Sequence, residues 1–292
     1  MKKPPAVALA LLALTLPAGP VAAQASQQAF PPHTIGNSQL RVLAPTAAGR
    51  HYQLHISLPA SYAKETTRRY PVVFVTDAYW DFQKIDAIRG GLVYDRVVPE
   101  FIVVGLGYAG ENLDYNNLRR WELSPAPFGG EGSGHAADFL RTIETEIIPF
   151  VEREYRADPS YRVLAGASLG GLFTLYSMLT RPDLFRAYIA ATPAVAVDNN
   201  WLFGYEDAFA KASRPLKARL FVSGGGNESP GFLGGILRFN QRIASRKTPG
   251  LAYEFRIIDG ERHAGMQFES YVRGLRFAFA PLAPESGPSP DR

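Results

Sequence analysis

The chain lacks several features that would direct it to a particular class of protein. It has no cysteine among its 292 residues, which excludes a disulfide framework and a lipid-modified cysteine. Its 31 basic and 27 acidic side chains nearly balance, and so small an excess does not indicate nucleic-acid binding. No internal repeat or heptad seam is present, and no apolar run reaches the about 20 residues of a membrane-spanning helix. We therefore expect a globular protein stabilised by packing.

Residues 1–23 have the three regions of a secretory signal peptide. Lys2 and Lys3 precede an apolar run over residues 6–16, and a small-residue triplet ends at Ala23. The run, of about 11 residues, is too short for a retained membrane anchor. Cleavage after Ala23 would lower the formal charge from +4 to +2. We expect a bacterial protein that is periplasmic or secreted, with no stable membrane insertion after cleavage.

The remaining sequence alternates between short β-rich runs and amphipathic helical stretches. This alternation is typical of a doubly wound, mostly parallel α/β sheet with helices on both faces. Many of the strand segments are continuous apolar runs, as strands buried on both faces should be. The expected strands cover residues 52–58, 71–76, 101–105, 162–165, 187–191, 219–223 and 253–258, and expected helices include 137–154, 172–179, 232–243 and 265–279.

A nucleophile elbow is the most informative motif. The G-x-S-x-G pattern of residues 166–170 lies between a predicted strand and a predicted helix, with Ser168 at its centre. Glycines on both sides of the serine allow the sharp turn that projects its hydroxyl from the sheet edge. We therefore predict Ser168 as the nucleophile of a hydrolase.

A serine hydroxyl needs a base to take its proton, and His263 is the best-placed histidine. It follows a late predicted strand and leads into the last predicted helix, where the base of an α/β-hydrolase lies. The other four histidines are interpreted as ordinary surface or packing residues: His33, His51, His55 and His135. His51 and His55 have no further ligand nearby in the sequence, so we expect no metal site.

The acid of a triad should lie between the serine and the histidine in the sequence. Glu228 is the preferred candidate, because it follows the strand 219–223 through a short glycine-rich segment. The alternatives are Asp198, Asp259 and Glu261, or a Ser-His dyad whose ring is oriented by a backbone carbonyl. Replacing Glu228 by Gln should then cost much less activity than replacing His263.

The oxyanion of a tetrahedral intermediate requires donors already aimed at it. The Leu169 N–H at the helix start is one expected donor, and the N–H of Ala78 or Tyr79, after the strand 71–76, is the second. Asp77 is expected to brace this loop. Residues 105–110 spell G-x-G-x-x-G, but a polar loop instead of a helix follows, so we expect no dinucleotide or other cofactor.

From about Val42 to Phe279, the chain resembles the putative esterase (esterase D) family of α/β-hydrolases. The segments that carry the resemblance are 70–77, 101–105, 119–125, 164–173, 181–185 and 259–263. The resemblance implies an α/β-hydrolase domain over 41–280. The irregular composition of the two ends predicts an N-terminal extension at 24–40 and a flexible tail at 281–292. In residues 192–195 the chain has Thr-Pro-Ala-Val where many relatives have Ser-Pro-Ser and an aromatic residue.

Within the family, the export signal and the segment 119–125 most resemble periplasmic siderophore esterases, which cleave the trilactone of ferric enterobactin. This substrate is a bulky trianion, for which cationic and aromatic side chains would be suitable partners. The candidate substrate contacts are Arg119, Arg120, Trp121, Trp80, Trp201 and Arg262.

The leading hypothesis is an exported serine esterase that opens an enterobactin-type trilactone, with a small-molecule ester, either iron-free or an iron-loaded siderophore, as its partner. Alternatives are a feruloyl or acyl-sugar esterase and a mycolyl-type acyltransferase, in which an alcohol replaces water. A non-catalytic periplasmic binding protein, which keeps the fold without the reaction, is a third hypothesis, motivated by the basic and aromatic candidate contacts and by the open identity of the acid.

Overall fold

The computed structural model describes residues 34–44, 46, 49–127, 132–197, 201–212 and 215–284. The predicted signal peptide, most of the predicted extension 24–40 and residues 285–292 of the predicted tail lie outside the described residues. No helix in the described ranges is long and apolar enough to cross a membrane.

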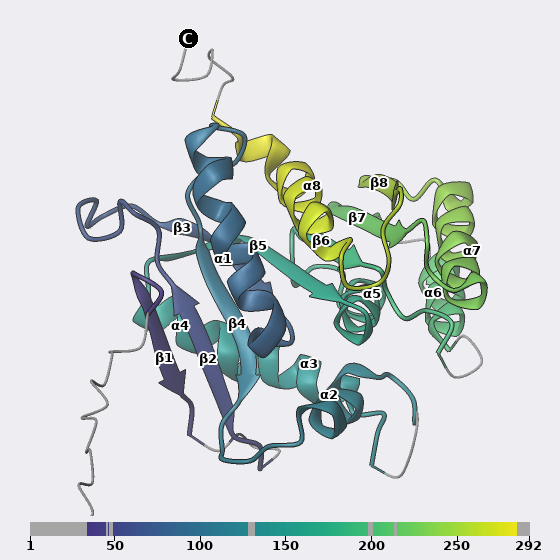
Figure 1. Ribbon diagram of the computed structural model, residues 1–292, viewed down its shortest axis with the longest axis horizontal. Helices are drawn as coiled ribbons and strands as arrows, with labels where there is room; N and C mark the ends of the chain where they lie inside the picture. The colour runs from purple at the N-terminus through teal and green to yellow at the C-terminus, as the bar shows by residue number, and fades with distance from the viewer. Residues whose placement is uncertain are drawn as a thin grey trace, which may run out of the picture. The chain divides into compact units, whose positions relative to one another are not determined.

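An eight-stranded sheet organises residues 35–284, with the strand order β1-β2-β4-β3-β5-β6-β7-β8 (Figure 1). Strands β3 to β8 are parallel, and β1 and β2 are antiparallel to their neighbours. The α/β fold expected from the sequence is thereby confirmed. The strands are β1 Ser38–Val42, β2 Tyr52–Ser57, β3 Tyr70–Val75, β4 Ile102–Tyr108, β5 Ala157–Ala167, β6 Ala187–Ala191, β7 Ala218–Gly225 and β8 Leu251–Ile258.

Strand β1 was not expected, and it crosses the predicted domain boundary between residues 40 and 41. Its sequence, SQLRV, has no continuous apolar run, and Leu40 and Val42 are exposed. Because β1 is an edge strand that pairs only with β2, its side chains need not be apolar.

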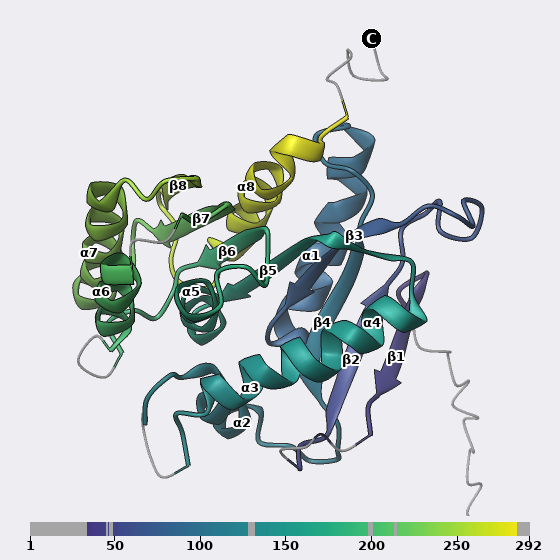
Figure 2. The same cartoon turned by 180° about the vertical axis from the view of Figure 1, so that it is seen from behind.

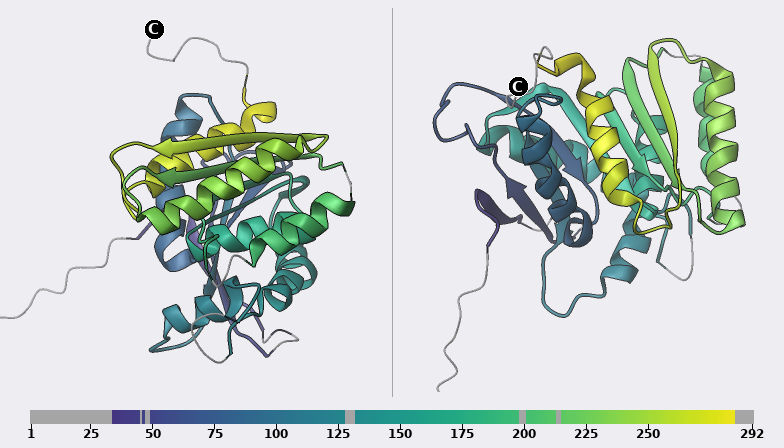
Figure 3. Two further views of the ribbon diagram at one scale, coloured as in Figure 1. Left: turned by 90° about the vertical axis from the view of Figure 1, so that its right-hand side faces the viewer. Right: turned by 45° about the horizontal axis from the view of Figure 1, so that its top comes forward.

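Helices cover both faces of the sheet, and each face has its own core. Alternation along β3 directs Val73 and Val75 into one core and Val72 and Phe74 into the other. Helices α1 and α8 cover the first face, and α3 to α7 cover the second (Figures 1 and 2). Figure 3 shows the β8 edge, with α7 and α8 on opposite sides. The helices are α1 Ala78–Tyr94, α2 Tyr115–Leu123, α3 Ala136–Thr142, α4 Ile148–Glu154, α5 Leu169–Thr180, α6 Leu202–Ala212, α7 Pro230–Arg246 and α8 Gln267–Phe279, with a final 3-10 turn at Ala280–Leu282.

The single helix predicted over 137–154 is interrupted by a π-helical turn, Ile143–Ile147, between α3 and α4. Pro149 supplies the physical reason. A proline inside an α-helix has no N–H and its ring clashes with the carbonyl four residues earlier, and a wider turn relieves both problems.

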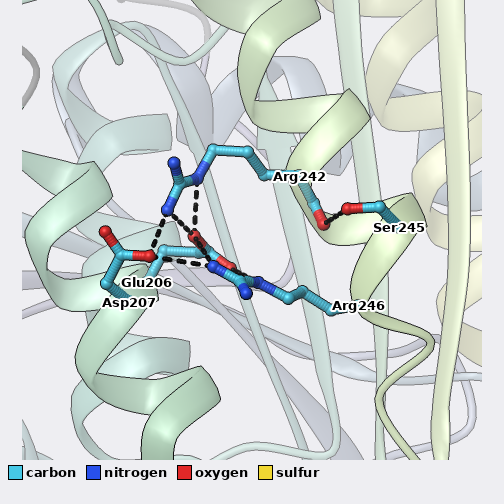
Figure 4. Close-up of polar contacts among 5 residues, drawn as sticks. All are labelled: Glu206, Asp207, Arg242, Ser245 and Arg246. Carbon is cyan, nitrogen blue, oxygen red and sulfur yellow. Dashed lines mark hydrogen bonds and ion pairs between the residues drawn. The ribbon is translucent and has the colours of Figure 1, made fainter.

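Helices α6 and α7 are joined by a cluster of charges (Figure 4). Glu206, 1 % exposed, accepts hydrogen bonds from Nε of Arg242 at 2.6 Å and Nε of Arg246 at 2.9 Å. Arg246 also reaches Asp207 at 2.8 Å. Two guanidinium groups thereby compensate a carboxylate that is removed from water.

Candidate active site

The predicted elbow is present between β5 and α5. Ser168 has φ of 58°, in the region that non-glycine residues rarely adopt. A Cβ atom at Gly166 would lie 2.4 Å from the carbonyl oxygen of Gly170, and one at Gly170 would lie 2.2 Å from Thr76 Oγ1. Both flanking positions therefore require glycine for steric reasons, and the turn places Ser168 at the N-terminus of α5.

His263 and Glu228 lie together beyond the ends of β8 and β7. The His263 Nδ1 atom is 3.1 Å from Oε1 and 3.2 Å from Oε2 of Glu228. The Glu228 side chain is 4 % exposed and the His263 side chain 40 % exposed. Phe232 packs its ring perpendicular to the imidazole, with centroids 5.0 Å apart. A carboxylate that holds Nδ1 leaves Nε2 as the nitrogen able to accept a proton.

The other acid candidates have different positions. Asp259 and Glu261 are exposed residues of the loop that leads from β8 to His263, and the carbonyl of Glu261 accepts from the N–H of Asn227 at 2.9 Å. Asp198 lies outside the described residues. Of the described candidates, Glu228 is the one whose carboxylate contacts the imidazole.

Ser168 and His263 line the same pocket, of about 260 Å³. No hydrogen bond joins their side chains within the described ranges. Catalytic hydrogen bonds are often long in the absence of substrate and shorten in its complex, so a shared pocket is the relevant geometric criterion.

The expected oxyanion donors lie at two helix starts. Leu169 is the first residue of α5 and Ala78 the first of α1, with Tyr79 next, so the predicted loop after β3 is in fact a helix N-terminus. The first N–H groups of a helix have no partner inside it and point toward negative charge. The two helix starts can therefore provide donors without any further motif.

The G-x-G-x-x-G segment has a packing role. A Cβ atom at Gly105 would lie 2.9 Å from Cβ of Ala78, and one at Gly107 would lie 3.3 Å from the same atom. These two glycines of β4 let the start of α1 approach the sheet closely.

Asp77, predicted to brace the loop after β3, connects the start of α1 to α2. It is 8 % exposed, has φ of 52°, and accepts from Nε and an Nη of Arg119 at 2.9 and 2.8 Å. Arg119 lines the Ser168 pocket, but two N–H groups on one edge of its guanidinium are already bonded to Asp77.

A second ion pair in the pocket was missed by the sequence reasoning. Lys84 Nζ lies 2.6 Å from Asp81 Oδ1 and 2.6 Å from Gln267 Oε1, and the three residues line the pocket. Burial raises the pKa of Asp81, and the Lys84 ammonium opposes this rise. The two pocket cations, Lys84 and Arg119, are thus each paired with a buried carboxylate.

An aromatic shelf, formed by Tyr79, Trp80 and Tyr115, adjoins the pocket. Tyr79 and Tyr115 stack with centroids 4.9 Å apart, and Trp80 meets Tyr79 edge-on at 5.4 Å. Tyr79 is 60 % and Trp80 40 % exposed, and Trp80 lines the pocket. Tyr115 was not predicted, because it opens α2 in a segment interpreted as a polar loop.

The remaining predicted substrate contacts lie outside this pocket. Trp121 stacks on His135 at 3.7 Å and lies under the Arg50 guanidinium at 3.8 Å, beside a separate pocket. Arg120 is on the exposed side of α2, Trp201 is 52 % exposed just before α6, and Arg262 is exposed next to His263. Their role in substrate binding stays a prediction. No group of His, Asp or Glu side chains in the described ranges could hold a metal ion.

Comparison with known proteins places this geometry in a family. Residues 46–219 match the family described as putative esterase. The ferri-bacillibactin esterase BesA of Bacillus subtilis is 28 % identical over 269 residues, covering 86 % of this chain and 92 % of that protein. An endo-1,4-beta-xylanase/feruloyl esterase of Xylanibacter ruminicola is 26 % identical over 240 residues, covering 78 % of this chain and 29 % of that protein.

A solved structure has a similar fold. The BES protein from Bacillus cereus is similar with a TM-score of 0.77 and 25 % identity, over 86 % of this chain and 97 % of that one. The sheet order, the elbow and the matched family agree, and the chain belongs to the putative esterase family of α/β-hydrolases and is a hydrolase of ester bonds.

Proposed function

We propose that the chain is an exported serine esterase that opens the lactone esters of a catecholate siderophore through an acyl-enzyme on Ser168. The observation that carries the proposal is that His263, held by Glu228, lines one pocket with the elbow serine. The name of the Bacillus subtilis relative supports a siderophore ester as the substrate, and the N-terminal sequence supports export.

The mechanism follows from these groups. Ser168 Oγ attacks the ester carbonyl carbon while its proton passes to Nε2 of His263, and Glu228 stabilises the imidazolium through Nδ1. The negative charge that develops on the carbonyl oxygen is stabilised by N–H groups of Leu169 and of Ala78 or Tyr79. The imidazolium then gives its proton to the leaving alcohol. Water repeats the sequence on the acyl-enzyme and releases the acid.

The aromatic shelf favours an aryl group in the substrate. Exposed rings beside a reactive serine can stack on a catechol ring, and the shelf would bury apolar ring area that is otherwise in water. The same feature suits a feruloyl ester, and this second candidate function is supported by the feruloyl esterase relative.

The test has two stages. Hydrolysis of a p-nitrophenyl ester and labelling by a fluorophosphonate should both be lost in Ser168→Ala, while Ser177→Ala, a serine buried within α5, should keep both. A protein that is folded but never labelled would instead be a binding protein. Mass spectrometry of products from iron-free enterobactin, ferric enterobactin and a feruloylated sugar then identifies the substrate. Release of ferulate alone would overturn the siderophore assignment.

A further inference from the structure

Thr192 occupies a strained position directly after β6. Its φ is 40°, and its side chain is fully buried. A β-branched residue in this region of backbone conformation is a genuine outlier, and such residues persist only when surrounding contacts hold them. The contacts of Thr192 must therefore stabilise this backbone conformation.

The Thr192 hydroxyl lies between the acid and the histidine. It donates a hydrogen bond to Oε1 of Glu228, and its oxygen is 3.4 Å from Nδ1 of His263. Its backbone N–H donates to the carbonyl of Ser223 at 2.8 Å. Thr192 thereby links β6 to the segments after β7 and β8 at the same edge of the sheet.

The residues on both sides of Thr192 hold the backbone of the nucleophile. The Ser168 N–H donates to the carbonyl of Ala191 at 3.0 Å, and the Ala194 N–H donates to the carbonyl of Ser168 at 3.0 Å. A Cβ atom at Gly171 would lie 3.0 Å from that same Ala191 oxygen, so α5 packs directly on this segment. One short segment therefore contacts the nucleophile through its backbone and the acid–histidine pair through Thr192.

We propose that Thr192 is a positioning residue that holds the Glu228 carboxylate in the orientation that accepts Nδ1–H of His263 and turns Nε2 toward Ser168. The proposal rests on the proposed serine mechanism and adds a residue to it. A glutamate side chain has three rotatable bonds, and Glu228 lies three residues beyond the end of β7, so its carboxylate needs a fixed donor. The Thr192 hydroxyl supplies that donor from a backbone that is itself tied to the elbow.

The hydroxyl, and not the shape of the side chain, is the group required. Thr192→Val keeps the β-branched shape and removes the hydroxyl, whereas Thr192→Ser keeps the hydroxyl and removes the methyl group. The matched control is Thr180→Val at the far end of α5, where the lost hydroxyl donates to the carbonyl of Tyr176 at 2.8 Å.

The experiment measures the rate of fluorophosphonate labelling, kcat and KM for p-nitrophenyl acetate, and thermal unfolding for each variant. Loss of one hydrogen bond to a charged group should lower the labelling rate and kcat of Thr192→Val roughly 10-fold, with KM nearly unchanged. Thr192→Ser should stay within about threefold of the wild type, and Thr180→Val should equal it. In a Glu228→Gln background, Thr192→Val should cost much less, because the two residues act as one unit.

Three results would overturn the proposal: a folded Thr192→Val that is labelled at the wild-type rate, a Thr192→Ser that is folded but loses more than tenfold, or full additivity with Glu228→Gln. If Thr192→Val does not fold, the comparison of Thr192→Ala with Thr192→Ser decides, because these two variants differ in the hydroxyl alone. A wild-type protein that is not labelled at Ser168 would refute the proposed function itself, which distinguishes the two failures.

Discussion

Two buried glutamates, Glu228 and Glu206, have opposite kinds of partner. Glu206 is compensated by Arg242 and Arg246, whose guanidinium groups carry a permanent charge. Glu228 faces His263, which is charged only while it holds a second proton, and a threonine hydroxyl. The first arrangement is complete in the resting protein, whereas the second gains its full electrostatic value when a proton reaches the imidazole.

The partners of the two carboxylates differ in what they lie beside and not in their exposure. The His263 side chain is 40 % exposed and lines the Ser168 pocket, while Arg246 is also 40 % exposed but lies with the Glu206 cluster between α6 and α7, outside that pocket (Figure 4). A buried carboxylate is therefore not by itself a sign of catalysis. The nature of its partner, and whether that partner shares a pocket with a nucleophile, separate a catalytic pair from a structural one.

The largest expected effect comes from removing the proton acceptor. His263→Ala should lower kcat roughly 10⁴-fold or more, because a base and its serine act as one unit. Steady-state hydrolysis of p-nitrophenyl acetate measures this change, and His135→Ala, a histidine that stacks on Trp121 away from the Ser168 pocket, is the control. Equal activities of the two variants would remove His263 from the mechanism.

The second effect should appear in stability and not in activity. Glu206→Gln leaves Arg242 and Arg246 without their shared buried carboxylate, which should cost about 3 kcal/mol of the free energy of unfolding. Asp207→Asn, at a position 49 % exposed, should cost less than about 1 kcal/mol. Urea denaturation and kcat of the folded fraction test both statements. A loss of kcat in folded Glu206→Gln would break the distinction between the two glutamates.

A smaller effect is expected at the acid of the site. Glu228→Gln keeps the shape and loses the charge, so the imidazolium loses one charge-assisted hydrogen bond. We expect kcat to fall roughly 10- to 100-fold with little change in the free energy of unfolding. An unchanged kcat would show that the site functions as a Ser-His dyad, the alternative that the sequence left open.

The sequence predicted the residues whose placement follows from chain order and local sterics. Ser168 stood out because a strand, two required glycines and a helix surround it, and His263 and Glu228 because parallel strands end at one edge of a sheet. Tyr115 was missed because its segment was interpreted as a polar loop, whereas the Lys84–Gln267 contact and the hydroxyl of Thr192 were missed for another reason. Their neighbours are distant in the chain, as with Lys84 and Gln267, 183 positions apart, and no local pattern records such pairs.

Glu122 is a third buried glutamate, and its contact with a cationic side chain is longer than those of Glu206. Its side chain is 0 % exposed, Oε1 accepts from the Tyr52 hydroxyl at 2.6 Å, and Arg50 is no closer than 3.8 Å. Burial raises the pKa of Glu122 to about 7, against the opposing effects of Tyr52 and Arg50. This carboxyl group is therefore partly protonated near neutral pH.

The smallest expected effect is a pH dependence of stability at this residue. The pKa in the folded protein lies above that of an unfolded chain, so folding takes up a proton, and the contribution of Glu122 is largest at low pH and is lost as pH rises through about 7. The wild type should lose roughly 1 kcal/mol more than Glu122→Gln between pH 6 and pH 8. Urea denaturation at the two pH values measures the difference. Parallel behaviour of the two proteins would mean that Glu122 is ionised throughout, and that the Tyr52 and Tyr108 hydroxyls with the distant Arg50 suffice to keep a buried carboxylate charged.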